Sequence, residues 1–445
     1  MKYAFAYGAD AVYAGQPRYS LRVRNNDFKL ENLEKGIDHA HQLGRKFFVA
    51  SNLMPHNSKV KTYMQDMEPV IALGPDALIM SDPGLIMMVR ECWPEMPVHL
   101  SVQANTVNYA SVKFWQSLGL ERVILSRELS LDEIEEIRQT CPDMELEVFV
   151  HGALCIAYSG RCLLSGYFNH RDPNQGSCTN SCRWDYKMHN AGENESGDIQ
   201  RIAPETLEFD AMAAMNTPEL FPETHSANPD RKRHPLAERV YLIEEPNRPG
   251  DYMPIFEDEH GTYIMNSKDL RAVQHVERLA RIGIDSLKIE GRTKSHYYVA
   301  RTAQIYRQAI DDAVAGREFN PDLYGKLDTL ANRGYTEGFY QRHPDQDYQN
   351  YLHNHSKLMQ QQFVGEVTAY NRDSGTAEVL VKNKLKVGDR IEVIAPGGNI
   401  DITLEKMESL HGEPMQEAAG GGYEIRIPLP ANNNLEQALL ARYLP

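Results

Sequence analysis

Short apolar segments rich in β-branched residues recur along this chain of 445 residues, and a helical pattern separates each from the next. Six of them begin about 20 to 35 residues apart, and a seventh comes late. They lie at 11–15, 46–52, 77–82, 98–103, 122–127, 147–152 and 285–292. Buried strands that alternate with helices form parallel sheets covered by helices, so the pattern predicts an α/β fold.

Seven strands are one fewer than a closed (β/α) barrel needs. The chain opens with a helical pattern that leads into the segment 11–15, so we expect the missing strand upstream of Met1. A doubly wound open sheet is the alternative. We favour a TIM-like (β/α) barrel, because most segments end in polar residues, and the carboxyl ends of barrel strands surround one site. These residues are Asn52, Asp82, Gln103, Arg127, Glu128, His151, Glu290 and Arg292.

Some of these polar residues have a simpler explanation as turn residues. That explanation suits Asn52 and Asp82, but it suits Gln103, His151 and Glu290 less well. We therefore expect the barrel mouth to carry functional side chains.

The segments between the predicted strands define the domains. We assign residues 1–340 to the barrel domain, with a cysteine-rich segment at 152–185. Residues 186–261 are polar and rich in Pro, Asn and Glu, which predicts a loop excursion. A helical pattern covers 269–284, with a plausible start at Ser267.

The chain changes character after a linker at 341–361. Residues 362–445 show short alternating strands and Gly/Asn turns, which predict a small antiparallel β-barrel domain. Such domains bind RNA or orient substrates in some proteins and are structural appendages in others.

The charge balance limits how this protein could bind nucleic acid. A net charge of −15 argues against coating of nucleic acid by charge alone, although a local basic face could still contact RNA. Basic residues gather at 231–234, 291–308 and 382–386, and each group is more often an ordinary solvated surface. No secretory signal or membrane-spanning stretch is visible, so we expect a cytoplasmic protein with reduced thiols.

Four of the six cysteines fall within one short segment, at Cys155, Cys162, Cys178 and Cys182. Only the last two have the spacing of a usual zinc site, whereas iron–sulfur clusters accept irregular spacing. The spacing favours a metal site, iron–sulfur over zinc, with disulfides or unlinked thiols as alternatives. A nucleophilic pair of His151 with Cys155 is a weaker alternative, because a thiolate that ligates a cluster cannot attack a carbonyl.

Several motifs resemble the collagenase-like peptidase family U32. They include EVFVHGALCIAYSGRCLLS at 147–165, NQGSCTNSCRW at 174–184 and SLKIEGRTKS at 286–295. The resemblance spans nearly the whole chain, and it is greatest to the branch of prephenate-dependent tRNA uridine 5-hydroxylases.

This resemblance implies a function, a cofactor and partners. It implies hydroxylation of the wobble uridine in tRNA anticodons, giving 5-hydroxyuridine, with prephenate as co-substrate or required metabolite. It also implies a 4Fe–4S cluster on Cys155, Cys162, Cys178 and Cys182, with Cys182 the most variable position among relatives. The partners would be the tRNA anticodon stem-loop, a dicarboxylate metabolite and an electron donor.

Residues at the predicted strand ends could carry this chemistry. Glu128, His151 and Glu290 are the acid–base candidates. Arg127 and Arg292 could bind a dicarboxylate, because a guanidinium can hold a carboxylate through two hydrogen bonds. Gln103 and Tyr13 complete the predicted substrate-binding set, and Tyr13, Tyr158 and Tyr167 could stack on a base. An ion pair between Arg127 and Glu290 is the structural alternative.

Two other functional classes remain open. A peptidase would need a nucleophile–base pair or a catalytic zinc motif, and neither H-E-x-x-H nor a G-x-S-x-G elbow is visible. A non-catalytic iron–sulfur RNA-binding factor is the third possibility.

Overall fold

The computed structural model divides the chain into two compact units. The first comprises Met1–Leu154, Asp269–Asp345 and Lys357–Pro445, and the second comprises Cys155–Lys268 and Gln346–Ser356. The structure describes residues 1–16, 18–20, 28–53, 55, 57–153, 157–158, 161–162, 187–193, 199–201, 241–244, 250, 252–258, 261–264, 269–291, 294–330, 335–341, 361–430 and 435–444.

A parallel sheet forms the centre of the first unit, as the spacing of apolar segments predicts. Six strands pair in chain order, and β15 pairs with β6 in the same direction. The strands are β1 (Ala11–Gly15), β2 (Lys46–Ser51), β3 (Ala77–Met80), β4 (Val98–Leu100), β5 (Arg122–Ile124), β6 (Glu145–Ala153) and β15 (Ser286–Ile289). All seven predicted strands are therefore present.

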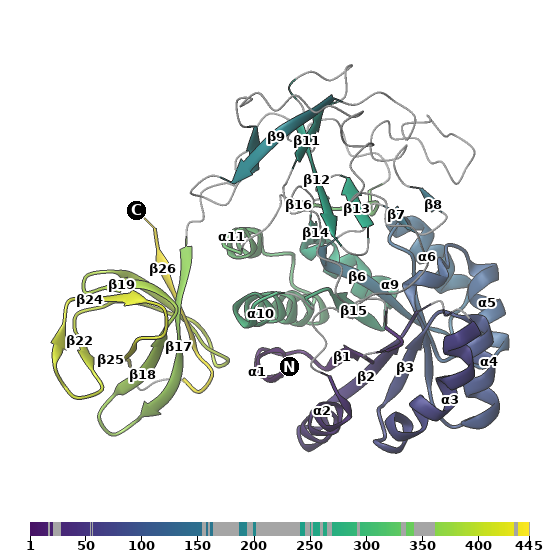
Figure 1. Cartoon of the computed structure of the whole chain (residues 1–445), viewed down its shortest axis with the longest axis horizontal. Coiled ribbons are helices and arrows are strands. Elements are labelled where there is room, and N and C mark those ends of the chain that lie inside the picture. The colour runs from purple at the N-terminus through teal and green to yellow at the C-terminus, as the bar shows by residue number, and fades with distance from the viewer. Residues whose placement is uncertain are drawn as a thin grey trace, which may run out of the picture. The chain divides into compact units, whose positions relative to one another are not determined.

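Helices lie along the outer side of this sheet (Figure 1). The N-terminal α1 (Lys2–Ala6) precedes β1, as predicted. Helix α6 (Leu131–Thr140) begins with a capping box between Ser130 and Glu133. The others that follow strands are α2 (Leu30–Gln42), α3 (Asn57–Ala72), α4 (Pro83–Cys92) and α5 (Tyr109–Ser117).

The predicted helix at 269–284 is wrong in its first part. Asp269–Arg271 form strand β14, which runs antiparallel to the end of β6, and the Ala272 amide donates to the Val150 carbonyl at 2.9 Å. This pairing uses backbone groups that a helix would need, so α9 begins only at Val276 and ends at Ile282. A short strand β16 (Tyr335–Thr336) pairs with β14.

The sheet curls, but no backbone pairing joins its two ends in the part of the chain that the structure describes. Strands β1 and β15 nevertheless lie near each other, because the Lys288 ammonium sits 4.1 Å from the centre of the Tyr13 ring. The parallel α/β fold is therefore confirmed, while closure into a barrel is not seen. Two helices follow β15, α10 (His296–Val314) and α11 (Asp322–Asp328).

The predicted loop excursion at 186–261 is wrong where the structure describes it. A five-stranded antiparallel sheet occupies this part of the chain, in the order β10-β9-β11-β12-β13. Its strands are β9 (Lys187–Glu193), β10 (Ile199–Arg201), β11 (Tyr241–Glu244), β12 (Tyr252–Asp258) and β13 (Gly261–Ile264). Strand β9 is polar, and segments rich in Pro, Asn and charged residues separate it from the more apolar β11 and β12, so this part of the sequence resembles a loop.

The C-terminal residues form an antiparallel β domain, as predicted. Its hydrogen-bonded order is β21-β20-β26-β17-β18-β25-β22-β23, and among the described residues no pairing closes this path. Its strands are β17 (Gln361–Asn371), β18 (Thr376–Val381), β20 (Arg390–Ile394), β21 (Ile400–Thr403), β22 (Met407–Ser409), β23 (Pro414–Met415), β25 (Glu424–Pro428) and β26 (Leu439–Tyr443), with β19 (Asn383–Lys386) and β24 (Glu417–Gly420) paired separately.

Buried polar contacts join the C-terminal β domain to α10 and α1. The Arg301 guanidinium binds both carboxylate oxygens of Glu392, at 2.9 and 2.8 Å, and only 2% of Arg301 is exposed. The Tyr7 hydroxyl donates to the Ile394 carbonyl at 2.7 Å. A desolvated bidentate pair fixes geometry closely, so this domain packs as an integral part of the first unit. No described helix is both long enough and apolar enough to span a membrane.

Candidate active site

Two buried charged side chains, Glu147 and Lys288, and the partly exposed Arg122 form an ion-paired group inside the curled sheet. Glu147 on β6 accepts a hydrogen bond from Lys288 on β15 at 2.6 Å and another from Arg122 on β5 at 3.1 Å. Burial alone would raise the pKa of the Glu147 carboxyl, but Lys288 and Arg122 outweigh it and lower that pKa to about 2. The carboxylate therefore stays ionised, and it fixes two cations from neighbouring strands.

A histidine and an aromatic ring border these charges. His99 on β4 packs edge-on against Phe48 on β2, with ring centres 4.8 Å apart. Burial, followed by the Arg122 charge, lowers the pKa of His99 to about 3, so its imidazole is neutral. The interior of the sheet is thus polar and tightly organised instead of uniformly apolar, which is typical of a sheet that supports a site above it.

The first and last parallel strands meet at their carboxyl ends. Tyr13 on β1 donates a hydrogen bond to the Glu290 carboxylate, which follows β15, at 3.1 Å. Glu290 is tied to β6 as well, because its amide donates to the His151 carbonyl at 2.8 Å. The structure therefore brings three of the predicted residues, Tyr13, His151 and Glu290, to one place.

The imidazole of His151 lies among three tyrosine rings. The ring centres of Tyr298, Tyr306 and Tyr335 lie 5.7, 5.4 and 5.6 Å from that of His151. Only 1% of His151 is exposed. Burial and the charges of Arg271 and Lys294 lower its pKa to about 3, so His151 is uncharged near neutral pH.

The hydrogen bonds around Tyr306 define the tautomer of His151. The Tyr306 hydroxyl donates its proton to the Val150 carbonyl at 2.7 Å, so at 3.3 Å it can only accept from Nδ1 of His151. Nδ1 then carries the hydrogen, and Nε2 carries a lone pair. Nε2 is buried and has no hydrogen-bond partner in the structure as described. Such a nitrogen can accept a proton or a hydrogen bond from a ligand.

Charged residues surround this tyrosine cluster. Lys294 lies 3.5 Å from the Asp269 carboxylate and 5.0 Å from the centre of the Tyr298 ring. Arg271 stacks on Tyr335 at 4.6 Å. Burial is the main reason that the pKa of the Tyr298 hydroxyl is raised, with Asp269 adding to it, so that hydroxyl remains protonated and can donate.

A glycine lets β6 and β15 approach closely beside His151. Gly152 has a φ of +106°, and a Cβ atom at this position would lie 2.3 Å from the Glu290 carbonyl oxygen. Only glycine adopts this conformation at low cost and leaves room for the neighbouring strand. The motif glycine after His151 therefore has a structural role in positioning Glu290.

A network of amides and a hydroxyl joins the ends of β2 and β4. The Asn52 amide donates to Ser101 Oγ at 3.2 Å and to Gln103 Oε1 at 3.0 Å. The Ser101 hydroxyl also donates to Gln103 Oε1. Asn52 and Ser101 are buried, whereas Gln103 is partly exposed. Hydrogen bonds from buried neighbours therefore fix the side-chain oxygen of the predicted substrate residue Gln103.

The two remaining predicted residues of the strand ends lie after β5. The Arg127 guanidinium stacks on the Phe149 ring, 3.8 Å from its centre. Glu128 accepts a hydrogen bond from the Ser126 hydroxyl. For the alternative ion pair between Arg127 and Glu290, the structure shows other contacts: Arg127 stacks on Phe149, and Glu290 accepts a hydrogen bond from Tyr13.

Other predicted residues lie where the structure gives little or no description. Arg292, Cys155, Cys178, Cys182 and Tyr167 are outside the described residues. For Tyr158 and Cys162 only the backbone is described, in the short strands β7 (Ala157–Tyr158) and β8 (Arg161–Cys162), where Ala157 pairs with Cys162. The predicted cluster ligands therefore remain predictions.

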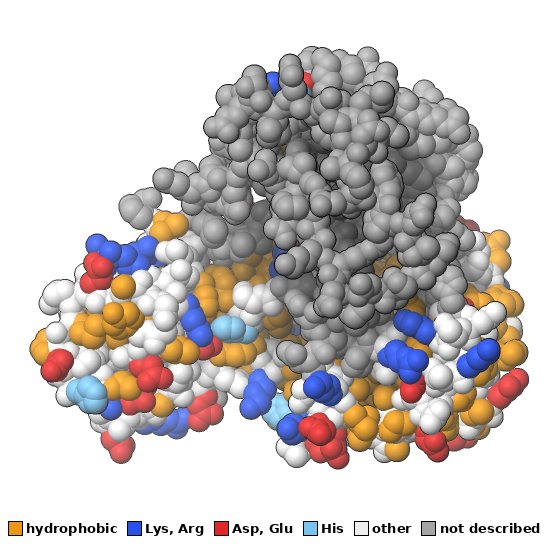
Figure 2. All heavy atoms as spheres, in the orientation of Figure 1, with side chains coloured by type: hydrophobic (Ala, Val, Ile, Leu, Met, Phe, Trp, Pro, Cys, Tyr) orange, Lys and Arg blue, Asp and Glu red, His pale blue; other side chains and the backbone are white. Residues whose placement is uncertain are grey.

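The predicted basic faces are ion-paired where they are described. Arg301 binds Glu392, and Arg307 binds Asp10 at 3.0 Å. In the segment 382–386, Lys382 pairs with Glu366, and Lys384 and Lys386 pair with Glu417. Basic and acidic side chains stand next to one another on the face shown in Figure 2. These residues act as surface and domain contacts, while 231–234 lies outside the described residues.

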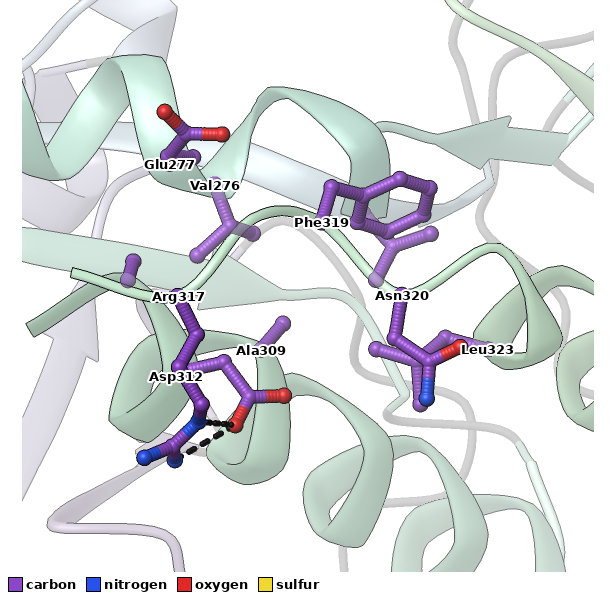
Figure 3. Close-up of a pocket in the computed structure, with 10 residues that line it drawn as sticks. Val276, Glu277, Ala309, Asp312, Arg317, Phe319, Asn320 and Leu323 are labelled. Carbon is purple, nitrogen blue, oxygen red and sulfur yellow. Dashed lines mark hydrogen bonds and ion pairs between the residues drawn. The ribbon is translucent and has the colours of Figure 1, made fainter. Parts of the chain in front are cut away.

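A small pocket lies in the helical layer, away from the strand ends. Figure 3 shows it between α9, α10 and the start of α11, with Asp312 and Arg317 joined by an ion pair at one side. Phe319 and Leu323 contribute apolar surface. It offers neither an unpaired charge nor the carboxyl end of a strand, so the candidate site remains the one around His151 and Glu290.

Several residues of this site were missed at the sequence level. Glu147 and His151 both lie on β6, and Lys288 lies on β15 two positions before Glu290, which follows that strand, while a β-bulge between Lys288 and Ile289 interrupts the alternation of faces. A charged residue in the middle of an otherwise apolar strand is the signal that could have revealed Glu147 and Lys288. Nothing in the local sequence points to Tyr298, Tyr306 and Tyr335, which come from more distant segments.

Known proteins resemble this chain over its whole length. Residues 1–350 match the model of Peptidase family U32, and residues 359–442 match that of the Peptidase family U32 C-terminal domain. The tRNA hydroxylation protein P of Escherichia coli (strain K12) is 60% identical over 442 residues, covering 99% of this chain and 94% of that protein.

Two further relatives show the breadth of the family. The tRNA hydroxylation protein P of Haemophilus influenzae (strain ATCC 51907 / DSM 11121 / KW20 / Rd) is 57% identical, covering 100% of this chain and 94% of that protein. A protein named Collagenase from Porphyromonas gingivalis (strain ATCC BAA-308 / W83) is 26% identical, covering 96% of this chain and 91% of that protein. Since the family models match nearly every residue, the chain belongs to peptidase family U32.

Proposed function

We propose that this chain is a tRNA-modifying enzyme that hydroxylates uridine. The observation that carries this proposal is its 60% identity, over 99% of its length, to a tRNA hydroxylation protein P. Relatives at 57% and 38% identity carry the same name. The site supports such chemistry, because it combines a neutral imidazole, a carboxylate and phenol donors at one edge of the sheet.

The substrate that we propose is the wobble uridine of tRNA anticodons, with 5-hydroxyuridine as product and prephenate as the required metabolite. The anticodon loop is single-stranded, so its bases can leave the stack and enter a protein site. We also infer that the curled sheet is an incomplete (β/α) barrel, and that the protein works in the cytoplasm.

Hydroxylation at C5 of uridine replaces the hydrogen on that carbon with oxygen. It is a two-electron oxidation, so it needs an oxidant as well as a group that accepts the released proton. Nε2 of His151 is our candidate acceptor for that proton, because its tautomer leaves a lone pair on Nε2 and Nε2 has no hydrogen-bond partner in the described structure. Glu290 is the second acid–base group, held by Tyr13. Glu128 is the third candidate, at the end of a neighbouring strand.

Cys155, Cys162, Cys178 and Cys182 would hold a 4Fe–4S cluster, since four thiolates are the usual ligand set of such a cluster. When bound, the cluster would supply electron transfer, with electrons exchanged with a separate donor. Arg127 and Arg292 would bind the carboxylates of prephenate.

A deletion strain tests the proposal directly. Its tRNA should lack 5-hydroxyuridine by mass spectrometry, and the wild-type gene should restore it. His151→Gln should restore less than about a tenth, because removal of an acid–base group typically costs 100-fold or more in rate. Full hydroxylation without this gene, or full restoration by His151→Gln together with Glu290→Gln, contradicts the proposal.

Anaerobic purification tests the cluster. Iron and sulfide should accompany the wild type and the Cys92→Ala control, and both should be lost in Cys162→Ala. A protein that carries zinc, or no metal under these conditions, rules the cluster out. Cleavage of casein or gelatin by cluster-free protein would favour a peptidase, and RNA binding without modification would favour a non-catalytic factor.

A further inference from the structure

We propose that Gln103 is a specificity-determining residue that recognises the 4-carbonyl group of the target uracil and so rejects cytosine. This inference rests on the proposed tRNA function, and it assigns the recognition of the base to the amide network at the ends of β2 and β4. The candidate acid–base residues lie at the same edge of the sheet.

The hydrogen bonds of the network define how the Gln103 amide is turned. Its oxygen accepts from the Asn52 amide at 3.0 Å and from the Ser101 hydroxyl. Both of these neighbours are buried, with 9% and 2% exposed, so the amide oxygen is directed into the protein. The NH2 group must then be directed away from the network.

The NH2 group of Gln103 is available to a ligand. Gln103 is partly exposed, and no described residue accepts a hydrogen bond from its Nε2. The backbone is held as well, because Gln103 lies in the 3-10 turn η1 (Val102–Ala104) and its carbonyl accepts from the Asn105 side chain at 3.3 Å. A purely structural glutamine would hydrogen-bond through both its amide oxygen and its NH2 group, whereas among the described residues only the oxygen of Gln103 does so.

The location fits base recognition. Ser101 and Asn52 directly follow strands β4 and β2, and these strands run parallel to β1, β6 and β15. In parallel sheets the carboxyl ends lie at one edge, so Gln103 shares that edge with Glu290 and His151. A base that reaches the acid–base residues would therefore also come close to Gln103.

Uracil and cytosine differ in the group that such a donor would meet. Position 4 of uracil is a carbonyl, which accepts a hydrogen bond, whereas position 4 of cytosine is an amine, which donates one. A fixed NH2 donor therefore binds uracil and leaves two donors facing each other with cytosine. A site built around one hydrogen bond rejects the analogue that cannot make it.

The test uses full-length protein and two anticodon stem-loop RNAs that differ only in uridine or cytidine at the first anticodon position. Binding is measured without added carboxylates, because a carboxylate could accept from the same NH2 group. The wild type should prefer the uridine RNA by roughly tenfold. Gln103→Met should lose this preference, and Gln103→Glu, which accepts in place of donating, should reverse it. Gln116→Met on α5 is the matched control.

Each outcome decides one question. If the wild type restores 5-hydroxyuridine in the deletion strain but Gln103→Met retains the uridine preference, the role of Gln103 is overturned and the tRNA function stands. If the wild type restores nothing yet its uridine preference disappears in Gln103→Met, base recognition stands and hydroxylation does not. If the wild type binds both RNAs equally, the inference is wrong. Thermal unfolding at the wild-type temperature would confirm that each variant is folded.

Discussion

Tyr13 and Glu290 are hydrogen-bonded across 3.1 Å although 277 positions separate them in the chain. The bond links the first parallel strand, β1, to the end of the last, β15. Tyr13→Phe removes the donor and retains the ring that packs on Lys288. We expect 5-hydroxyuridine formation to fall about tenfold, because a hydrogen bond to a charged group contributes about 1.5–3 kcal/mol. Tyr109→Phe on α5 should leave it unchanged.

The stability of the protein should be sensitive to the loss of one member of the ion-paired group formed by Glu147, Lys288 and Arg122. Lys288→Met leaves the Glu147 carboxylate buried with Arg122 and Ser286 as its remaining partners. We expect the free energy of unfolding to fall by about 3–5 kcal/mol, as measured by urea denaturation. The double variant Glu147→Gln with Lys288→Met should recover part of this loss. A double variant less stable than either single one would refute the coupling.

The close approach of β6 and β15 predicts a strong effect at Gly152. A Cβ atom there would lie 2.3 Å from a backbone oxygen, and φ is +106°. Gly152→Ala should destabilise the protein by about 3 kcal/mol or more, since strain and overpacking add. Gly74→Ala is the matched control, because its φ is +69° with no atom within 4 Å, and it should cost only about 1 kcal/mol.

Two buried neutral histidines predict a loss of stability in mild acid. The pKa values of His99 and His151 are lowered to about 3 in the folded protein, against about 6.5 in the unfolded chain. Above about pH 6.5 both states are neutral. Below it only the unfolded chain takes up protons, so stability should fall by about 1.4 kcal/mol per pH unit for each histidine.

Urea denaturation between about pH 6.5 and about pH 5 measures this slope. Glu147 does not contribute in that window, because its stabilising charge is lost only below about pH 4.5. The variant His99→Gln should show about half of the histidine contribution. An unchanged slope would mean that His99 is protonated in the folded state.

The contact between α10 and the C-terminal β domain predicts that the two unfold together. Arg301→Met leaves Glu392 buried, with Gln361 and Asn399 as its remaining hydrogen-bond donors. We expect a loss of about 3–5 kcal/mol in the free energy of unfolding. Arg317→Met, which removes an exposed ion pair with Asp312, should cost less than about 1 kcal/mol. Equal effects would show that the buried pair contributes no more than a surface pair.

Local periodicity was enough to predict the parallel strands and the antiparallel C-terminal domain. It failed where long-range pairing decides the structure. Residues 269–271 have a helical pattern, but they form a strand because β6 offers unpaired backbone groups there. The five-stranded sheet at 187–264 was missed for a related reason, since short strands gain their stability from neighbours that are distant in sequence.

The candidate site was predictable only in part. Polar residues at strand ends pointed to His151 and Glu290, and Tyr13 was predicted for substrate binding; the structure brings these three together. The tyrosines around His151 could not be assigned, because α10 and β16 contribute them from far along the chain. The tautomer of His151 depends on Tyr306, and no sequence pattern reports such a hydrogen bond.

The buried pair of Arg301 and Glu392 also has an evolutionary consequence. A lineage that lost the C-terminal domain would expose the Arg301 guanidinium to water and remove its counter-charge, so the constraint on position 301 would disappear. Loss of the domain should therefore be accompanied by variation at this position. Transplanting the domain onto another family member should succeed only where the recipient carries a cation at the corresponding turn of its helix.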